Sequence, residues 1–353
     1  MTSSENAVLR GGIATGVGSW PGTNAREAAA TIVGELPDLP HLVELPGRAT
    51  GSDMIGRASA LLVDMLFEIT PRGYRVAPGP GAVSRRAFDL IRVDLDALEE
   101  AWETAGLAGT GRTVKVQAAG PLTLAAQVEL AGGHRMLTDR GALRDLSESL
   151  AEGLSQHAAE VGKRLGAKVV VQLDEPSLTS VLDGSIRGAS VLHTVRALPG
   201  PEALAVLDTV VAALEQPVLV HTCAESPALG LLRGSAAAAV GFDIAAIGKR
   251  DLDGIGELLD SGKHLALGLV PTVAPAGRVT WRDIAEPAVR LMDRLGFSRR
   301  LLAERVIVTP ACGLAGASQD WARRALELAT ETARVFTDEP ESIDVDPQSQ
   351  PPK

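Results

Sequence analysis

The sequence has few cysteines, a deficit of basic residues and no long apolar run. Its 353 residues include only two cysteines, and 34 basic against 44 acidic side chains give a formal net charge of −10. A surface that binds phosphate groups needs a basic excess or stripe, so nucleic acid is not expected as a partner. The chain contains no run of about 18 apolar residues, so no membrane-spanning segment is expected either.

The N-terminal residues MTSSENAVLRGG lack the basic region and the apolar region of a secretory signal. The protein is therefore expected to be cytoplasmic, and thiols stay reduced in the cytosol. A disulfide between Cys223 and Cys312 is then not expected. The two cysteines are either small buried apolar residues or metal ligands.

Short apolar runs alternate with segments of helical periodicity along the chain. The runs that predict strands are eight in number and span residues 12–19, 41–45, 112–120, 167–175, 217–223, 242–248, 264–270 and 305–313. Several consist almost entirely of Val, Ile, Leu and Ala, which is typical of parallel strands buried on both faces. Segments such as 24–36, 281–296 and 318–336 have the apolar spacing of amphipathic helices. This alternation predicts an α/β fold and, more specifically, a (β/α)8 TIM barrel.

The predicted barrel is a single domain over residues 11–336. Residues 1–10 are polar and expected to be flexible. The acidic, Pro-rich tail 337–353 has no apolar periodicity and is expected to be disordered. Segment 68–93, which is rich in Pro, Gly and Arg, is expected to be an insertion with a hairpin or a loop. Residues 177–199 are expected to form a second excursion, after the fourth strand.

Polar side chains collect at the carboxyl ends of the predicted strands, where a TIM barrel carries its active site. His221 and Cys223 end the fifth strand and, two residues apart in an extended segment, face the same side. Cys312 ends the eighth strand, which neighbours the first in a closed barrel. One imidazole and two thiolates suit Zn²⁺ and leave a fourth position open. Each residue alone is more often an ordinary buried residue, but together they predict a zinc site.

The motif Asp174-Glu175-Pro176 ends the fourth predicted strand and has two interpretations. The two acids could simply end the strand and cap the next turn. Alternatively, a carboxylate beside the zinc site binds an ammonium group or accepts a proton. Strand alternation turns Glu175 away from the mouth of the barrel, so Asp174 is the candidate for this role.

These motifs, in this order, resemble the C-terminal catalytic domain of cobalamin-independent methionine synthase, a relative of the uroporphyrinogen decarboxylase barrels. The resemblance covers most of residues 12–335 and rests on TGVGSWPGT (15–23), GSDMIG (51–56), AAGPLTLA (118–125), VQLDEPSL (171–178), VHTCAE (220–225) and TPACGLAG (309–316). It implies a TIM barrel, a Zn²⁺ cofactor and a small thiol such as homocysteine that accepts a methyl group. It also implies zinc ligation by His221, Cys223 and Cys312, and substrate binding by Ser19 and Asp174.

Three positions depart from the pattern of that family. Gly248 stands where the family has a glutamate zinc ligand, which leaves the fourth ligand open, with Glu225 as a local alternative. Arg48 stands where the family has a second substrate-binding carboxylate, and an arginine there is expected to bind an anionic group. Val273 stands in place of a histidine that is thought to help protonate the folate.

The resemblance implies a zinc-dependent S-methyltransferase of the methionine synthase type, with a folate or a corrinoid as methyl donor. The alternatives are a thiol alkyltransferase that acts on an anionic thiol or uses a methyl-corrinoid donor, a decarboxylase-like barrel that binds a tetrapyrrole, and a non-catalytic binding barrel. The decarboxylase chemistry needs basic residues around the mouth, and the His-x-Cys…Cys set speaks against it.

Overall fold

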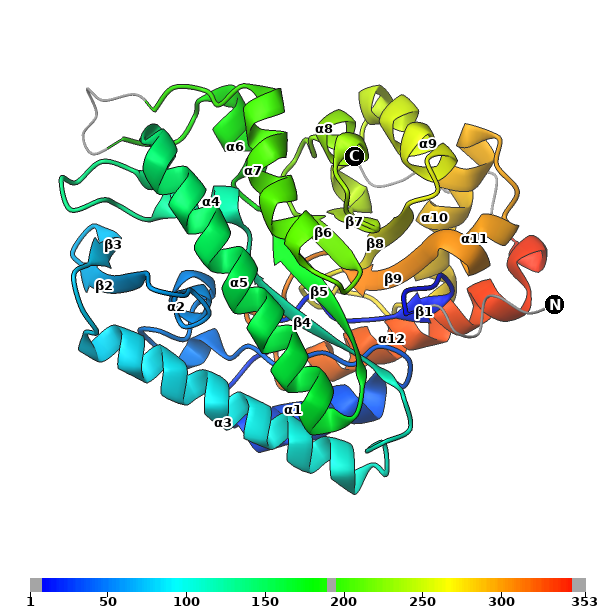
Figure 1. Cartoon of the computed structure of the whole chain (residues 1–353). Helices are drawn as coiled ribbons and strands as arrows, with labels where there is room; N and C mark the ends of the chain where they lie inside the picture. Colours follow the sequence, from blue (N-terminus) through cyan, green and yellow to red (C-terminus); the bar gives the residue numbers. More distant parts are fainter. Residues whose placement is uncertain (1–7, 189–194, 345–353) are drawn as a thin grey trace.

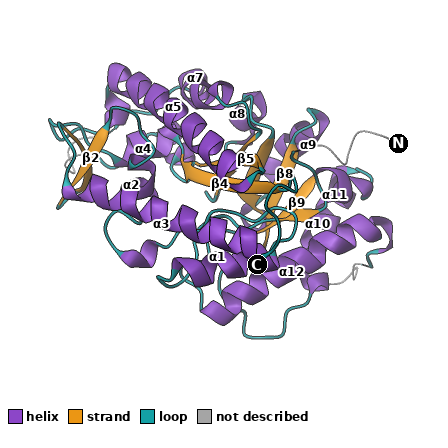
Figure 2. Cartoon of the chain, turned by 60° about the horizontal axis from the view of Figure 1, so that its bottom comes forward, coloured by secondary structure: helices purple, strands orange, loops and turns teal. Residues whose placement is uncertain are grey.

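The computed structural model of the chain describes residues 8–188 and 195–344. Its central element is a seven-stranded parallel sheet in the order β1-β9-β8-β7-β6-β5-β4, and this sheet curls while helices cover its outer face (Figure 1, Figure 2). The strands of the sheet are β1 (Ile13–Ala14), β4 (Thr113–Ala119), β5 (Lys168–Asp174), β6 (Val218–Thr222), β7 (Ala239–Asp243), β8 (His264–Val270) and β9 (Val306–Pro310). The predicted α/β class is thereby confirmed.

Helices connect successive strands, as the apolar spacing of the sequence predicts. They are α1 (Ala25–Glu35), α2 (Met54–Ser59), α3 (Ala82–Thr104), α4 (Pro121–Gln127), α5 (Arg140–Leu165), α6 (Leu178–Asp183), α7 (Gly200–Ala213), α8 (Leu229–Gly234), α9 (Leu252–Asp260), α10 (Trp281–Leu295), α11 (Arg300–Arg305) and α12 (Gln319–Asp338). Single 3-10 turns are η1 (Pro46–Arg48), η2 (Met136–Thr138), η3 (Ile244–Ala246), η4 (Lys249–Asp251) and η5 (Pro340–Ser342).

The predicted insertion contains a hairpin, since β2 (Leu66–Thr70) and β3 (Gly73–Ala77) pair in antiparallel fashion apart from the main sheet. From residue 82 onward the same segment is already helix α3. Of the segments with a predicted lack of structure, residues 1–7 and 345–353 lie outside the described residues. The first part of the predicted disordered tail 337–353 differs from the prediction, since it contains the end of α12, the turn η5 and the buried side chain of Ile343. So do residues 189–194 of the second excursion.

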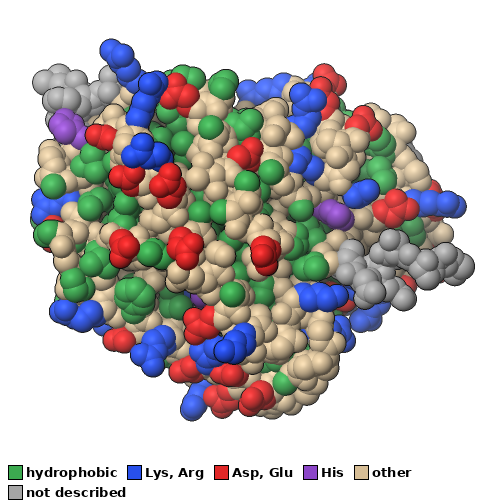
Figure 3. Space-filling model, in the orientation of Figure 1, with side chains coloured by type: hydrophobic (Ala, Val, Ile, Leu, Met, Phe, Trp, Pro, Cys, Tyr) green, Lys and Arg blue, Asp and Glu red, His purple; other side chains and the backbone are tan. Residues whose placement is uncertain are grey.

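One face of the molecule is mixed in charge. Figure 3 shows acidic and basic side chains interspersed over one face of the molecule. Across residues 8–188 and 195–344, none of the helices combines the length and the apolar character needed to cross a membrane.

Segment 41–45 was expected to be the second strand of the sheet, but it does not form a regular strand. The segment makes only isolated parallel bridges, through His41 to β4 on one side and through Glu44 to the chain just beyond β1 on the other. Pro40 and Pro46 flank it, and a proline has no N–H to contribute to a strand ladder. Regular pairing therefore stops after a few residues, although the segment lies between the two edge strands.

Strand β7 lies earlier in the chain than predicted, at Ala239–Asp243 instead of 242–248. Its first residues follow a run of alanines, which have a low strand propensity, and this composition hides the start of the strand. Residues Ile244–Ala246 form a 3-10 turn. Asp243, and not Gly248, therefore ends the strand at the edge of the sheet.

Side chains on the inner side of the curled sheet form an apolar layer below a polar one. The apolar layer is a core cluster of its own, separate from the core between sheet and helices, and includes Ile13, Val170, Leu219, Ala266 and Ile307. Side chains two residues further along a strand face the same side. At these positions the chain has the buried polar residues Thr15, Gln172, His221 and Thr309. The polar groups at the end of the sheet thus rest on an apolar floor.

Glu175 follows β5 and points away from this inner side, as strand alternation predicts. Its buried carboxylate accepts hydrogen bonds from the backbone N–H groups of Leu122 and Thr123, at 2.9 and 2.7 Å, and from the Thr123 hydroxyl at 2.6 Å. These donors belong to the first turn of α4, where N–H groups have no partner within the helix. Burial raises the pKa of Glu175 to about 7, while the three hydrogen bonds lower it. Glu175 is thus a structural cap.

Replacing Glu175 with glutamine removes one acceptor oxygen and brings an NH2 group against the N–H donors of α4. We expect Glu175→Gln to lower the free energy of unfolding by about 1–3 kcal/mol, as for a buried donor left unsatisfied. The measurement is urea unfolding, with Glu148→Gln on the exposed face of α5 as the control, which should change stability by less than about 0.5 kcal/mol. Equal stability of both variants would contradict the capping role.

Candidate metal centre and substrate cavity

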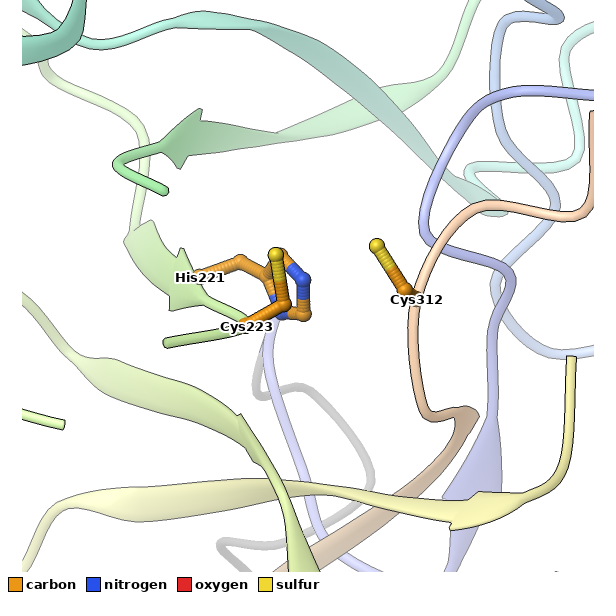
Figure 4. Close-up of side chains that lie close together, drawn as sticks. All are labelled: His221, Cys223 and Cys312. Atoms are coloured by element: carbon orange, nitrogen blue, oxygen red, sulfur yellow. The ribbon is translucent and has the colours of Figure 1, made fainter. Parts of the chain in front are cut away.

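Three potential metal ligands meet at the carboxyl end of the sheet. His221 belongs to β6, Cys223 follows the end of that strand, and Cys312 follows β9. One donor atom from each residue lies within 4.8 Å of the other two. Figure 4 shows the imidazole ring and both sulfur atoms facing the same space. The structure thus brings together the three residues that the sequence predicts as ligands.

The environment of His221 leaves one ring nitrogen without a partner. Its Nε2 atom is buried, and within the described ranges it has no hydrogen-bond partner. An unpaired buried polar atom is unfavourable, and a metal ion on Nε2 would remove that penalty. The other ring nitrogen, Nδ1, would lie 3.1 Å from a Cβ added to Gly241 on the adjacent strand. Because Gly241 has no side chain, there is space for the imidazole ring beside β7.

The two thiols lie close together and influence each other in opposite directions. Interaction with Cys223 and with His221 lowers the pKa of the Cys312 thiol to about 4. Interaction with Cys312, together with burial, raises the pKa of the Cys223 thiol. His221 is buried, while Cys312 is partly exposed and Cys223 exposed. A thiolate at an accessible edge beside an imidazole is a suitable environment for a soft divalent cation.

Asp243 is an acidic residue at this edge that the sequence analysis missed. It ends β7, the neighbour of β6 in the sheet. Burial raises the pKa of Asp243, and the charge of Cys312 raises it further. Its Oδ1 atom accepts a hydrogen bond from the N–H of Ala245 at 2.8 Å, and the carboxylate lies outside the group of three donor atoms within 4.8 Å. Gly248 instead begins the turn η4 and donates its N–H to Asp251. The signal was present in the sequence, because an apolar run ends in Asp both in VQLD of β5 and in VGFD of β7.

A cavity of about 230 Å³ opens beside the three potential ligands. Its lining includes five residues that the sequence predicts for the site and one, Glu44, that it does not. The five predicted residues are Ser19, Asp174, His221, Cys223 and Cys312. Burial raises the pKa of Asp174 to about 7, against the positive charges around it, which lower it. The predicted substrate-binding residues Ser19 and Asp174 therefore lie in one cavity with the candidate ligands.

Ser19 is held against the segment that carries Cys312. Its carbonyl accepts a hydrogen bond from the N–H of Leu314 at 2.9 Å. A Cβ added to Gly313 would come within 2.0 Å of the Ser19 hydroxyl oxygen. Only glycine therefore permits this approach, which joins the loop beyond β1 to the loop beyond β9.

Glu44 lines the cavity, whereas Arg48 does not belong to its lining. The Glu44 carboxylate is buried and lies 3.6 Å from the guanidinium of Arg57. Arg48 forms a two-pronged ion pair with buried Asp94, with both N–O distances at 2.7 Å. The binding of an anionic substrate group by Arg48 stays a prediction, and in this structure Asp94 occupies its guanidinium. An acid inside the apolar run HLVEL was the sequence signal for Glu44.

Two other predicted positions lie outside this cavity. Glu225 is exposed and is not a member of the cluster of potential ligands. Val273 is 71% exposed in the loop that follows β8 and does not line the cavity.

The sequence matches the family model of the catalytic domain of cobalamin-independent synthase over residues 13–335. No curated protein matches the sequence. The fold is similar to that of a B12-independent methionine synthase from Shewanella sp. W3-18-1 in complex with selenomethionine, with a TM-score of 0.60 and 12% identity, over 93% of this chain and 98% of that chain. It is also similar to a methyltransferase from Methanosarcina mazei, with a TM-score of 0.54 and 14% identity, over 92% of either chain.

At such low identities the two solved structures establish a shared fold, and the family assignment rests on the match over residues 13–335. That match confirms the resemblance inferred from the motifs around Ser19, Asp174, His221 and Cys312. The chain therefore belongs to the family of cobalamin-independent synthase catalytic domains and is a methyltransferase of that type.

Proposed function

We propose that the chain is a zinc-dependent S-methyltransferase that methylates the thiol of a small amino acid such as homocysteine. The observation that carries this proposal is the cluster of His221, Cys223 and Cys312, whose donor atoms lie within 4.8 Å of one another beside a cavity. Membership of the family supports a methyltetrahydrofolate-type donor. The comparisons give no support to a methyl-corrinoid donor.

The donor set fits zinc. An imidazole and two thiolates are common zinc ligands, and the unpaired Nε2 of His221 leaves a lone pair available for a cation. A bound Zn²⁺ supplies acidity, because it lowers the pKa of a coordinated thiol into the neutral range. We propose Asp243 as a further oxygen ligand, supported by its place at the end of the strand next to β6 and by its electrostatic coupling to Cys312.

The acids of the cavity favour an amino-acid thiol as the substrate. Asp174 and Glu44 both line the cavity, and an ammonium group is the natural partner of two carboxylates. Ser19 supplies a hydroxyl for further hydrogen bonds. These residues would bind and orient the acceptor, so that the reaction becomes effectively intramolecular once the donor is bound.

The same lining argues against two alternatives from the sequence. The cavity is lined by no Lys or Arg side chain from the described part of the chain. A tetrapyrrole with several carboxylates, or an anionic thiol, would need such cationic partners. The volume of about 230 Å³ also suits a small molecule.

We further infer that the fold is a closed TIM barrel in which segment 41–44 takes the eighth position. The support comes from hydrogen bonds on both sides of the segment. Leu42 donates its N–H to the carbonyl of Lys115 in β4 at 2.9 Å, and Glu44 donates its N–H to the carbonyl of Gly18 at 3.1 Å. The segment would thus bridge the two edges of the seven-stranded sheet.

Metal analysis of the purified protein should give about one Zn²⁺ per chain. We expect Cys223→Ser and Cys312→Ser to lose the metal, because each variant removes one of the thiolate ligands. Asp243→Asn should weaken zinc binding by about tenfold or more, the loss that even a supporting group of a zinc site produces. Competition with a chelator of known affinity measures these changes.

Glu225→Gln is the control for these variants, because Glu225 is an exposed acid near Cys223. It should bind zinc as the wild-type protein does. A wild-type protein that carries no zinc after purification without chelators would contradict the proposed metal site. Loss of zinc in Glu225→Gln alone would transfer the role of Asp243 to Glu225.

Asp174→Asn should raise the KM for homocysteine by about tenfold to a hundredfold, since a hydrogen bond to a charged group contributes about 1.5–3 kcal/mol. The assay is methionine formation from 5-methyltetrahydrofolate by the zinc-loaded enzyme. The KM for 4-sulfanylbutanoate, which has the same thiol and carboxylate but lacks the amino group, should stay the same. An equal loss for both thiols would show that Asp174 does not bind the ammonium group.

A further inference from the structure

Lys115 is a fully buried lysine on the inner side of the sheet, and neither the metal centre nor the cavity lining uses it. It belongs to β4, and its side chain is 0% exposed. A lysine is almost never buried to this extent without partners. Burial lowers the pKa of Lys115 to about 8, and the charges of Asp174 and Glu44 act in the opposite direction. The burial of this cation therefore has to be explained by its interactions within the protein.

The partners of Lys115 lead directly to the cavity. Its Nζ donates to the side-chain oxygen Oε1 of Gln172 at 2.8 Å and to the carbonyl of Val17 at 3.1 Å. Gln172 in turn donates from Nε2 to Oδ1 of Asp174 at 2.7 Å and to the carbonyl of Val17 at 2.7 Å. A continuous chain of hydrogen bonds therefore runs from the ammonium group through one amide to the carboxylate in the cavity.

The chemistry of the ammonium group fixes the direction of this chain. An ammonium group can only donate hydrogen bonds, so the oxygen of the Gln172 amide must face Lys115. The NH2 group of the same amide must then face Asp174, and a carboxylate can accept from it. The hydrogen bond from Lys115 thus acts together with those from Nε2 to the Val17 carbonyl and to Asp174 in holding the amide in this one orientation.

Two cations lie near the two acids of the cavity. Glu44 has Arg57 at 3.6 Å and also interacts with the charge of Lys115, whereas Asp174 is connected to Lys115 through the Gln172 amide. A buried carboxylate without a nearby cation is strongly disfavoured in its charged form. Lys115 is thus one of the positive charges that favour the charged form of Asp174, and it is connected to this carboxylate through the Gln172 amide.

We propose that Lys115 is a positioning residue, which acts through Gln172 to hold the Asp174 carboxylate in the cavity as the binding partner of the substrate ammonium group. This proposal rests on the proposed function, because it assigns the ammonium group of an amino-acid thiol to Asp174. It predicts that Lys115 controls which thiol binds, although the lysine does not line the cavity.

The test compares the zinc-loaded wild-type enzyme with Lys115→Met, a substitution of similar length that removes the charge and the donors. KM and kcat are measured with homocysteine and with 4-sulfanylbutanoate. Lys115→Met should raise the KM for homocysteine about tenfold with little change in kcat, because it removes binding that ground state and transition state share. The KM for 4-sulfanylbutanoate should not change, and Lys115→Arg should restore part of the preference.

Two further variants separate positioning from a general effect on the fold. Gln172→Leu breaks the connection between Lys115 and Asp174 while Lys115 stays in place, so this variant should also lose the preference for homocysteine. It tests the proposal independently if Lys115→Met does not fold. Lys263→Met is the matched control, because the Lys263 ammonium donates to the backbone carbonyls of Ser235 and Ala237, at 2.7 and 2.6 Å, outside the cavity. It should keep the wild-type preference.

A wild-type ratio of the two KM values in Lys115→Met and in Gln172→Leu would overturn the proposal and leave the proposed function intact. An equal loss for both thiols would also overturn it, since it would reduce Lys115 to a structural role. Failure of the proposed function has a different signature, because the wild-type enzyme itself would then show no preference for homocysteine.

Discussion

Parallel strands end at a common edge of their sheet, and the whole site depends on this constraint. Residues far apart in the sequence, such as Ser19, Asp174, His221 and Cys312, lie together because each follows or ends one strand of the same sheet. The apolar layer beneath them excludes water from one side of the site. Electrostatic interactions at this edge are therefore stronger than they would be on an open surface.

The polar groups at the edge are matched to one another in two different ways. Most of them are satisfied within the protein, as Gln172 is by Lys115 and Asp174. The Nε2 atom of His221 instead has no hydrogen-bond partner in the described part of the chain, and it lies beside the two thiols in a group of donor atoms that could hold a cation. Fixed hydrogen bonds and potential metal ligands therefore lie side by side, which is the arrangement expected of a preorganised site.

The parts of this site that the sequence predicted share a simple physical signal. The Val-rich runs of β5 and β6 could be recognised as buried parallel strands, and the period of two then placed His221 and Cys223 on one side. Asp243 was missed because the alanines before β7 hide the start of the strand. The predicted end of the strand was therefore too late, and Asp243 was not recognised as the residue at the edge of the sheet. Glu44 was missed because Pro40 and Pro46 keep its segment irregular, so that no alternation rule applies. The burial of Arg48 against Asp94 depends on the packing of α3, which no local pattern contains.

The central claim is that the substrate thiol binds at a zinc ion held by His221, Cys223 and Cys312. The X-ray absorption spectrum of the zinc-loaded protein, recorded with and without homocysteine, tests this claim most directly. We expect zinc to carry the sulfur atoms of both cysteines in the free protein and one additional sulfur after homocysteine is added. A zinc–sulfur coordination number that is the same in both spectra would contradict the account.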